Sequence, residues 1–230
     1  MKKYELTSET KVINGVELHR IKALKSFGNI YEGDLGGWIE SEKNLSQDGD
    51  AWVFDNAEVS GNAIVSENAT VSGNAMIRGN ATVEDKATVS GNAIVSGNAI
   101  VNENAVVFEN ATVSGNAIVS GNATVSGNAT VEDKATVRGN ATISGNATVR
   151  GKEDFIVFKN WWSSGRYFTW TRSNNKWKVG CFMGTGEELI AKAYKDSEKS
   201  GREYERVVKY VNDILKEEDN DNGNRNKCED

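Results

Sequence analysis

Hydrophobic positions recur every six residues between Ala51 and Lys152, and this repeat predicts most of the fold. The stretch divides into seventeen hexads without a remainder. Each hexad begins with Ala and has Val or Ile at its third place. The second and fourth places vary, the fifth is Gly, Asp or Glu, and the sixth is Asn or Lys. A repeat this regular indicates a stack of similar structural units rather than a domain with a mixed core.

The spacing within a hexad is typical of a short strand followed by a turn. Ala and Val at alternate positions place their side chains on the same face of a strand. Gly-Asn pairs tolerate a left-handed backbone, so the chain is able to turn after every strand. A hairpin would separate Ala and Val onto different sides. The pattern therefore predicts an all-β solenoid in which parallel strands stack around a continuous aliphatic core.

This pattern resembles the hexapeptide repeat of left-handed parallel β-helices. The resemblance implies three hexads per coil and a left-handed winding. With Leu45–Asp50 as a degenerate first hexad, we expect a solenoid over residues 45–152 with about six coils, roughly 29 Å long at ~4.8 Å per coil.

The segment before the repeat, residues 1–44, is expected to be a β-structured cap. Tyr4–Leu6 predicts a strand, and Asn14–Gly15 between two apolar runs predicts a hairpin with a type I′ turn. The open end of a solenoid exposes apolar side chains and unpaired strand backbone, which a capping segment covers.

The same segment carries a second resemblance. Leu18–Leu24, Gly33–Glu40 and Asn44–Ser46 (LHRIKAL, GDLGGWIE and NLS) resemble the leader of a family of bacterial and prophage hexapeptide-repeat proteins of unassigned activity. Members of that family are often labelled acetyltransferase-like or polymer-forming because of the repeat. The resemblance implies a prophage-type protein that acts in the cytoplasm of a bacterial host cell.

One histidine, His19, bears on the enzyme question. Hexapeptide acyltransferases, which the repeat resembles, use a histidine general base at a subunit boundary. No hexad of this chain contains a histidine, and no loop interrupts the hexads. We expect His19 to be structural, and we expect no catalytic residue and no cofactor. An acetyltransferase-like enzyme remains an alternative.

The outward second-place residues form columns at 18-residue spacing, and two columns carry aliphatic side chains. An exposed apolar patch favours self-association. We expect a homo-oligomer, a trimer by resemblance to proteins of this fold, with these candidate interface residues: Ile64, Met76, Ile94, Ile100 and Ile118. The remaining column is mostly Thr, and the fourth-place residues beside it are mostly Ser; this Thr-x-Ser array resembles ice-binding faces and leaves an ice-binding surface as a further alternative. Trp52, Phe54, Val106 and Phe108 interrupt it as outward residues.

Residues 153–216 predict a small α+β domain. Phe155–Phe158 favours a strand, and 167–171 and 176–182 form a hairpin around 173–175. Capping boxes at Thr185–Glu188 and Ser200–Glu203 predict two helices, the first ending near Lys195. Residues 217–230 are polar and are expected to be a disordered tail.

This domain holds the candidate binding residues, because aromatic and donor side chains gather near its strand ends and a helix start. The candidates are Trp161, Trp162, Ser163, Arg166, Arg172, Lys176, Lys178 and Thr185. Arg166 with the helix N-terminus at Thr185 would hold a small anion, which is the second alternative. The opposing interpretation of the aromatic residues is an ordinary core.

Composition and net charge limit the classes of partner that we expect. The net charge of −6 argues against a nucleic-acid partner. The chain has two cysteines, no apolar run of the ~20 residues that a membrane span needs, and no apparent metal-binding pattern. We therefore expect a cytoplasmic, non-enzymatic interaction protein. Its rigid solenoid presents the C-terminal domain to a protein partner, as an inhibitor of a host defence system would.

Overall fold

The computed structural model describes residues 2–225, and it describes side chains as far as residue 218. The chain divides into two units. The solenoid unit comprises the residues up to Val157 together with Thr169–Asn174, and the C-terminal unit comprises Phe158–Phe168 and the chain from Asn175 onward. Each unit is described by itself.

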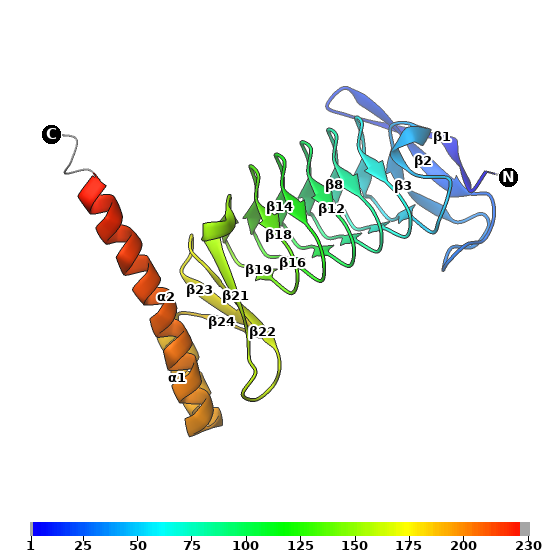
Figure 1. The fold of residues 1–230 in the computed structure, drawn as a ribbon. Helices are drawn as coiled ribbons and strands as arrows, with labels where there is room; N and C mark the ends of the chain where they lie inside the picture. Colours follow the sequence, from blue (N-terminus) through cyan, green and yellow to red (C-terminus); the bar gives the residue numbers. More distant parts are fainter. Residues whose placement is uncertain (1, 226–230) are drawn as a thin grey trace. The chain divides into compact units, whose positions relative to one another are not determined.

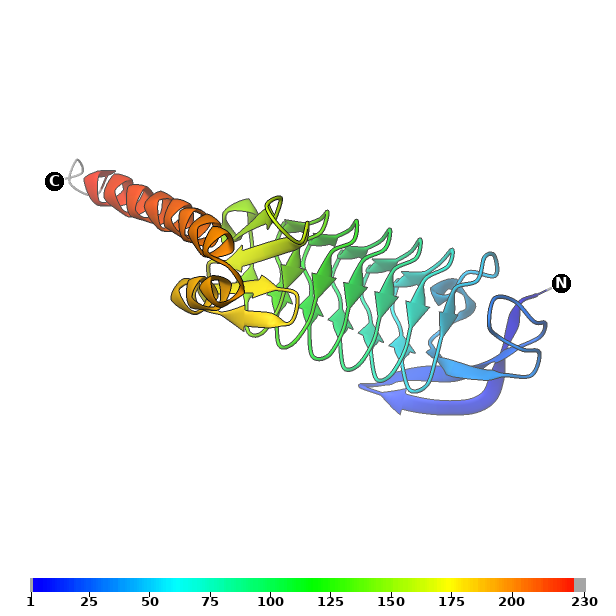
Figure 2. The same cartoon turned by 90° about the horizontal axis from the view of Figure 1, so that it is seen from below.

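The repeat forms the expected β-solenoid of about six coils (Figures 1 and 2). Every hexad contributes a two-residue strand, and each strand before the last coil pairs in parallel with the strand 18 residues further on, as Ile100 does with Ile118. The coil of three hexads is thereby confirmed. The left-handed winding stays a prediction from the resemblance.

Three sheets make up the solenoid. The first sheet contains β5 (Glu58–Val59), β8 (Met76–Ile77), β11 (Ile94–Val95), β14 (Thr112–Val113), β17 (Thr130–Val131) and β20 (Thr148–Val149). The second contains β4 (Trp52–Val53), β7 (Thr70–Val71), β10 (Thr88–Val89), β13 (Val106–Val107), β16 (Thr124–Val125) and β19 (Thr142–Ile143). The third contains β6 (Ile64–Val65), β9 (Thr82–Val83), β12 (Ile100–Val101), β15 (Ile118–Val119) and β18 (Thr136–Val137).

The core of the solenoid consists of the first-place Ala and third-place Val or Ile side chains. All of them are exposed by at most 1%. A small side chain fits beside each corner and a β-branched one fits the flat of each strand. At the corners, the sixth-place amides form ladders along the stack. For example, Asn80 Nδ2 donates to Asn98 Oδ1 at 2.9 Å, and Asn98 Nδ2 donates to Asn116 Oδ1 at 3.0 Å.

The N-terminal segment extends the first sheet. β1 (Tyr4–Ile13) and β2 (Val16–Ala23) form an antiparallel hairpin, and β3 (Leu35–Ile39) pairs with β2 and then, in parallel, with β5. Asn14 and Gly15 at its turn have φ values of 51° and 82°. Positive φ at both residues is what a type I′ turn requires, so the predicted hairpin is confirmed.

Trp52 corrects the expectation that its side chain lies on the outer surface. It points outward from the coil, but it is 1% exposed because the N-terminal segment covers it. Its ring meets those of Tyr4 and Phe27 edge-on, with centroids 6.1 and 5.5 Å away. Phe54 packs against the core. Ser126 and Ser144 are also buried, so the Thr/Ser column is not a continuous hydroxyl face of the kind that ice binding needs.

Hydroxyl groups close the last coil. The backbone N–H groups of Thr142 and Thr148 have no further coil to pair with. Thr142 N donates to Thr169 Oγ1 at 2.9 Å, and Thr148 N donates to Ser173 Oγ at 2.7 Å. These bonds explain why Thr169–Asn174 belongs to the solenoid unit rather than to a separate domain beginning at residue 153.

The rest of the chain contributes four strands and two helices. The strands pair in the order β21 (Phe155–Lys159), β22 (Tyr167–Thr171), β23 (Lys176–Val179) and β24 (Phe182–Gly184). The helices are α1 (Gly186–Asp196) and α2 (Glu198–Arg225), and short 3₁₀ turns span Glu42–Asn44 and Lys152–Asp154.

Helix α2 differs from the sequence prediction at both ends. It begins at Glu198, where Ser200 N donates to Ser197 Oγ at 3.1 Å, so Ser197 provides the cap expected from Ser200. It continues to Arg225, so residues 217–225, expected as disordered tail, are helical. Only Glu217, Glu218 and Arg225 of this segment have good helix propensity, so the segment extends a helix that is already nucleated rather than forming one by itself. Residues 226–230 lie outside the described residues.

Candidate functional site

The loop that joins β21 to β22 holds several of the candidate residues in a defined conformation. Asn160 is 3% exposed, and its Oδ1 accepts from the backbone N–H and the hydroxyl of Ser163 at 3.0 and 3.1 Å. Asn160 N also donates to Arg166 O at 2.8 Å. These bonds join the two ends of the loop and constrain its backbone conformation.

Trp161 and Trp162 are adjacent but have opposite roles. Trp161 is 75% exposed, whereas Trp162 is buried. The Trp162 ring meets Tyr204 and Phe168 edge-on, with centroids 5.1 and 6.1 Å away, and meets Trp161 at 6.1 Å. Trp162 is thus a core residue that supports Trp161, which corrects its selection as a binding residue.

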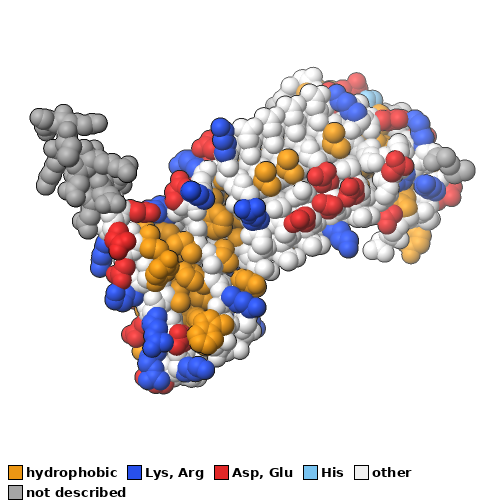
Figure 3. Space-filling model, viewed as in Figure 1, with side chains coloured by type: hydrophobic (Ala, Val, Ile, Leu, Met, Phe, Trp, Pro, Cys, Tyr) orange, Lys and Arg blue, Asp and Glu red, His pale blue; other side chains and the backbone are white. Residues whose placement is uncertain are grey.

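Trp161 lies in a stretch of the chain that is rich in basic and aromatic residues. Tyr167, 41% exposed, begins β22, and Lys159 Nζ lies 5.7 Å from the centre of its ring. Residues 155–186 contain five basic and no acidic side chains, although the whole chain has a net charge of −6. Hydrophobic side chains gather over the C-terminal unit in Figure 3, with both basic and acidic side chains at the edge of the cluster. The basic residues close to Trp161 in the sequence would complement an acidic partner.

Of three further candidates, Arg172 occupies a structural position. Arg172 belongs to the solenoid unit, where its Nε donates to Glu153 O at 3.1 Å and its guanidinium lies 5.9 Å from the Trp170 ring. Lys176 and Lys178 are half-buried on β23, on either side of the buried Trp177. Arg172 is therefore part of the solenoid closure, whereas the two lysines remain part of the basic surface.

Thr185 caps α1 and is already satisfied. Thr185 N donates to Glu188 Oε2 at 2.7 Å, and Glu188 N donates to Thr185 Oγ1 at 3.2 Å, which confirms the predicted capping box. The pKa of the Glu187 carboxyl lies below its usual value, because the backbone N–H of Glu187 and then the Thr185 hydroxyl donate hydrogen bonds to it. The carboxylates of Glu187 and Glu188 thus accept hydrogen bonds at this helix start. Arg166 lines a cavity whose walls do not include Thr185. The anion site expected from these two residues together is not formed.

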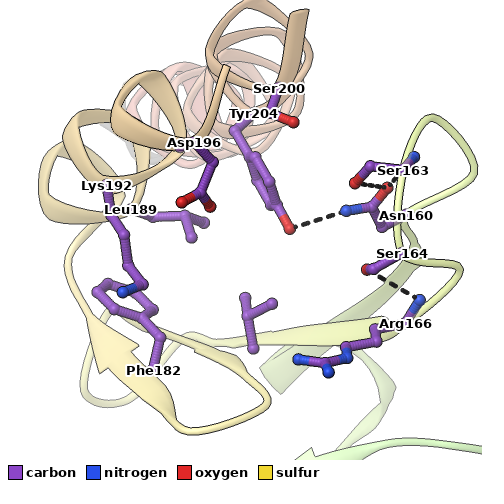
Figure 4. Close-up of a pocket in the computed structure, with 12 residues that line it drawn as sticks. Asn160, Ser163, Ser164, Arg166, Phe182, Leu189, Lys192, Asp196, Ser200 and Tyr204 are labelled. Atoms are coloured by element: carbon purple, nitrogen blue, oxygen red, sulfur yellow. Dashed lines mark hydrogen bonds between the residues drawn. The ribbon is translucent and has the colours of Figure 1, made fainter.

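The cavity beside Arg166 lies within the C-terminal unit and has a volume of about 180 Å³. The loop at Asn160–Arg166, helix α1 and the first turns of α2 form its walls (Figure 4). Lys192 and Asp196, one turn apart on α1, line it, as does Tyr204 from α2. Of the residues that line this cavity, Ser163 and Arg166 were predicted from the sequence as binding residues, whereas Lys192 and Asp196 were not. On a helix, Lys and Asp four residues apart usually indicate a solvated face.

The candidate oligomer interface remains a prediction. Ile64 is 44% exposed, whereas Met76, Ile94, Ile100 and Ile118 are half-buried. Met76 pairs with Ile94 and Ile100 pairs with Ile118 in neighbouring coils, so each side chain is partly covered by the next one in its column. On the face shown in Figure 3, hydrophobic side chains of the solenoid occur in small separate groups.

Residues 2–225 also contain one histidine, His19. His19 lies on β2, half-buried, and pairs with Thr10 and Ile39. No group of three or more His, Cys, Asp or Glu side chains is arranged to hold a metal ion in this part of the chain. Of the helices that the structure describes, neither is long and apolar enough to cross a bilayer.

Two comparisons with known proteins give matches, and the family-model match lies within the repeat. The family model described as "YdcK Beta solenoid repeat" matches residues 57–73, 87–103, 111–127 and 119–133. A curated protein of Escherichia coli (strain K12), named "Uncharacterized acetyltransferase YdcK", is 31% identical over 68 residues. That match covers 26% of this chain and about a fifth (21%) of the relative. The predicted resemblance to hexapeptide-repeat proteins of unassigned function is confirmed, and the likeness concerns the scaffold.

Proposed function

We propose that the protein is a non-enzymatic interaction protein whose β-solenoid presents the C-terminal unit to an acidic protein partner. The observation that carries this proposal is Trp161, a large aromatic side chain that is 75% exposed and held in place by buried Trp162. Exposed, preorganised Trp side chains are enriched among the residues that dominate binding energy in protein interfaces.

Charge supports an acidic partner. Up to residue 186, the C-terminal unit contains four basic residues, Lys159, Arg166, Lys176 and Lys178, and no acidic residue. Positive charges around an apolar anchor accelerate association with an acidic surface and disfavour basic ones. The prophage-type leader, Leu18–Leu24 and Gly33–Glu40, supports a bacterial protein as the partner, and a component of a host defence system fits this proposal.

Quantitative capture from a bacterial lysate tests the proposal. The intact chain serves as bait beside Trp161→Ala and Tyr31→Ala. Tyr31 is 72% exposed but belongs to the solenoid unit, so it is a matched control. We expect Trp161→Ala to lower recovery of the acidic partner by at least tenfold, since a hot-spot side chain contributes about 2 kcal/mol or more. Tyr31→Ala should recover it fully.

Two results would refute this function. One is identical sets of proteins recovered by the Trp161→Ala chain and the unchanged chain, when circular dichroism shows that both are folded. The other is a captured species that nuclease treatment removes, because the basic and aromatic surface would then bind nucleic acid.

An acetyltransferase-like activity is a second candidate, supported by the name of the similar E. coli protein. Incubation of the chain with acetyl-CoA and a panel of amine and hydroxyl acceptors would release free CoA if it transfers acetyl groups. Transfer that is lost in His19→Gln would favour this candidate over the interaction protein.

A further inference from the structure

The cavity beside Arg166 has the features of a small-ligand site, and these features do not depend on the Trp161 surface. All its walls belong to the C-terminal unit. Its volume of about 180 Å³ is below the ~300–1,000 Å³ of sites for drug-sized ligands. An occupant must therefore be a small metabolite-sized molecule.

Three charged side chains line this cavity without pairing with one another. Arg166 approaches from the loop before β22, and Lys192 and Asp196 approach from α1 (Figure 4). Within residues 2–225, none of the three forms a salt bridge. All three side chains are exposed, so water solvates their charges, and a ligand that displaces this water must carry matching charges. Two cations and one carboxylate complement a ligand that has two negative groups and one positive group.

Hydroxyl groups add donors to the cavity. Asn160 Nδ2 donates to Tyr204 Oη at 3.2 Å, which leaves the phenolic proton free to donate. Burial raises the pKa of Tyr204, so this hydroxyl is protonated at neutral pH. Arg166 N donates to Ser164 Oγ at 3.3 Å, so the Ser164 proton is also free. Donors thus outnumber the single carboxylate acceptor, Asp196, which favours an anionic ligand.

We propose that this cavity binds a small acidic amino acid, with Arg166 and Lys192 holding its two carboxylates and Asp196 holding its ammonium group. Tyr204 and Ser164 donate to the remaining carboxylate oxygens. The assignment follows from charge: a dicarboxylate without an amine leaves Asp196 unpaired, and a neutral amino acid leaves one cation unpaired.

Calorimetric titration of the full chain with L-aspartate, and separately with succinate, tests this site. Succinate has both carboxylates but lacks the ammonium group. We expect L-aspartate to bind at least tenfold more tightly than succinate and to raise the melting temperature. Arg166→Gln and Lys192→Gln should each lower the affinity for L-aspartate by about tenfold.

Two variants sharpen the result. Asp196→Asn should remove the preference for L-aspartate over succinate while leaving succinate binding intact. Lys195→Gln is the matched control for Lys192→Gln, because Lys195 is exposed on α1 but does not line the cavity. It should bind L-aspartate like the unchanged chain.

The assignment is overturned if the folded chain binds neither compound at concentrations up to roughly 10 mM. Equal affinity for L-aspartate and succinate would overturn the role of Asp196. If the Arg166→Gln variant bound L-aspartate normally, Arg166 would not be part of the binding site. None of these outcomes affects the Trp161 surface, so the interaction function is tested separately.

Discussion

Lys3 lies inside the N-terminal end of the solenoid unit and is 1% exposed. Its Nζ donates to the backbone carbonyl oxygens of Asp48, Gly49 and Ala51 at 3.4, 3.3 and 3.0 Å, and it lies 5.1 Å from the Phe27 ring. Burial lowers the pKa of Lys3 from 10.5 to about 8, although Asp50 and Asp48 partly oppose this. A protonated amine is therefore held in the cap at neutral pH at some cost in free energy.

The stability of the cap should consequently rise with pH above 8. The unfolded chain keeps Lys3 protonated to about pH 10.5, whereas the folded chain releases the proton near pH 8. Since the unfolded state binds more protons in this window, the free energy of unfolding increases from pH 8 to about pH 10, by about 1–3 kcal/mol. Denaturant unfolding at a series of pH values measures this increase.

Lys3→Met is the control for this prediction, because it fills the same space without a titrating group. Its unfolding free energy should lack the increase. Above about pH 10 the comparison ends, since burial raises the pKa of Tyr4 and that residue then favours the unfolded state. Parallel curves for the two chains between pH 8 and 10 would contradict the assignment to Lys3.

The tryptophans show what residue type alone leaves undecided. The sequence predicted surface or binding positions for three tryptophans, Trp52, Trp161 and Trp162. Their exposed fractions are 1%, 75% and 9%. Trp52 is covered by Tyr4 and Phe27, and Trp162 by Tyr204. Each covering residue lies more than twenty positions away in the chain, so local pattern contains no signal of it.

Each hexad forms a short strand followed by a corner, and the fifth-place residue affects the backbone conformation of that corner. Glycines at this place have φ near 70°, whereas Glu67, Asp85 and Glu103, stacked at one corner, have φ of 58–59°. The backbone thus adjusts slightly where a side chain is present. Asp and Glu at these places were correctly expected to be corner residues, because the hexad period is unbroken there.

At a corner, a side chain has two free-energy costs, one from the positive φ and one from a steric clash, and two glycines distinguish them. Gly97 and Gly139 share φ of +71°, but a Cβ at Gly97 would lie 2.8 Å from Gly115 O, and a Cβ at Gly139 would meet nothing within 4 Å. We expect Gly139→Ala to cost about 1 kcal/mol from backbone conformation alone, and Gly97→Ala to cost about 2–3 kcal/mol. Urea unfolding followed by circular dichroism provides both values. Equal losses would show that the stack accommodates the extra methyl group.

Helix boundaries were less predictable than the coils. The Thr185–Glu188 box marks the start of α1 correctly, but the similar Ser200–Glu203 pattern lies inside α2. Both satisfy the same local rule. The distinction arises because α1 ends at Asp196 and Ser197 immediately supplies the next cap, with Ser197 N donating to Ala193 O at 3.1 Å.

At the scale of the whole molecule, the outward aliphatic columns lead us to expect a homo-oligomer, favouring a trimer. Light scattering with size exclusion should give three times the chain mass. Ile100→Lys with Ile118→Lys should reduce that mass, because it places two charges on the third sheet where β12 pairs with β15. Thr88→Lys with Val106→Lys, an equivalent pair on the second sheet, is the control.

A mass equal to one chain for the unchanged protein would contradict the oligomer. A loss of mass caused equally by both double variants would instead contradict the third sheet as the interface. Either result leaves the solenoid itself intact, since all four substituted side chains point away from the core.

The sequence by itself determined the solenoid, its coil length, the inward residues and the capped hairpin at Asn14–Gly15. It does so because every hexad meets the same local requirements, and an unbroken period extends one local solution along the whole stack. The tertiary structure alone decided which aromatic side chains are buried, how the last coil closes on Thr169 and Ser173, and which charges share the cavity. Those outcomes depend on contacts such as the one between Asn160 and Tyr204, 44 residues apart. No periodic signal connects positions brought together by the fold alone.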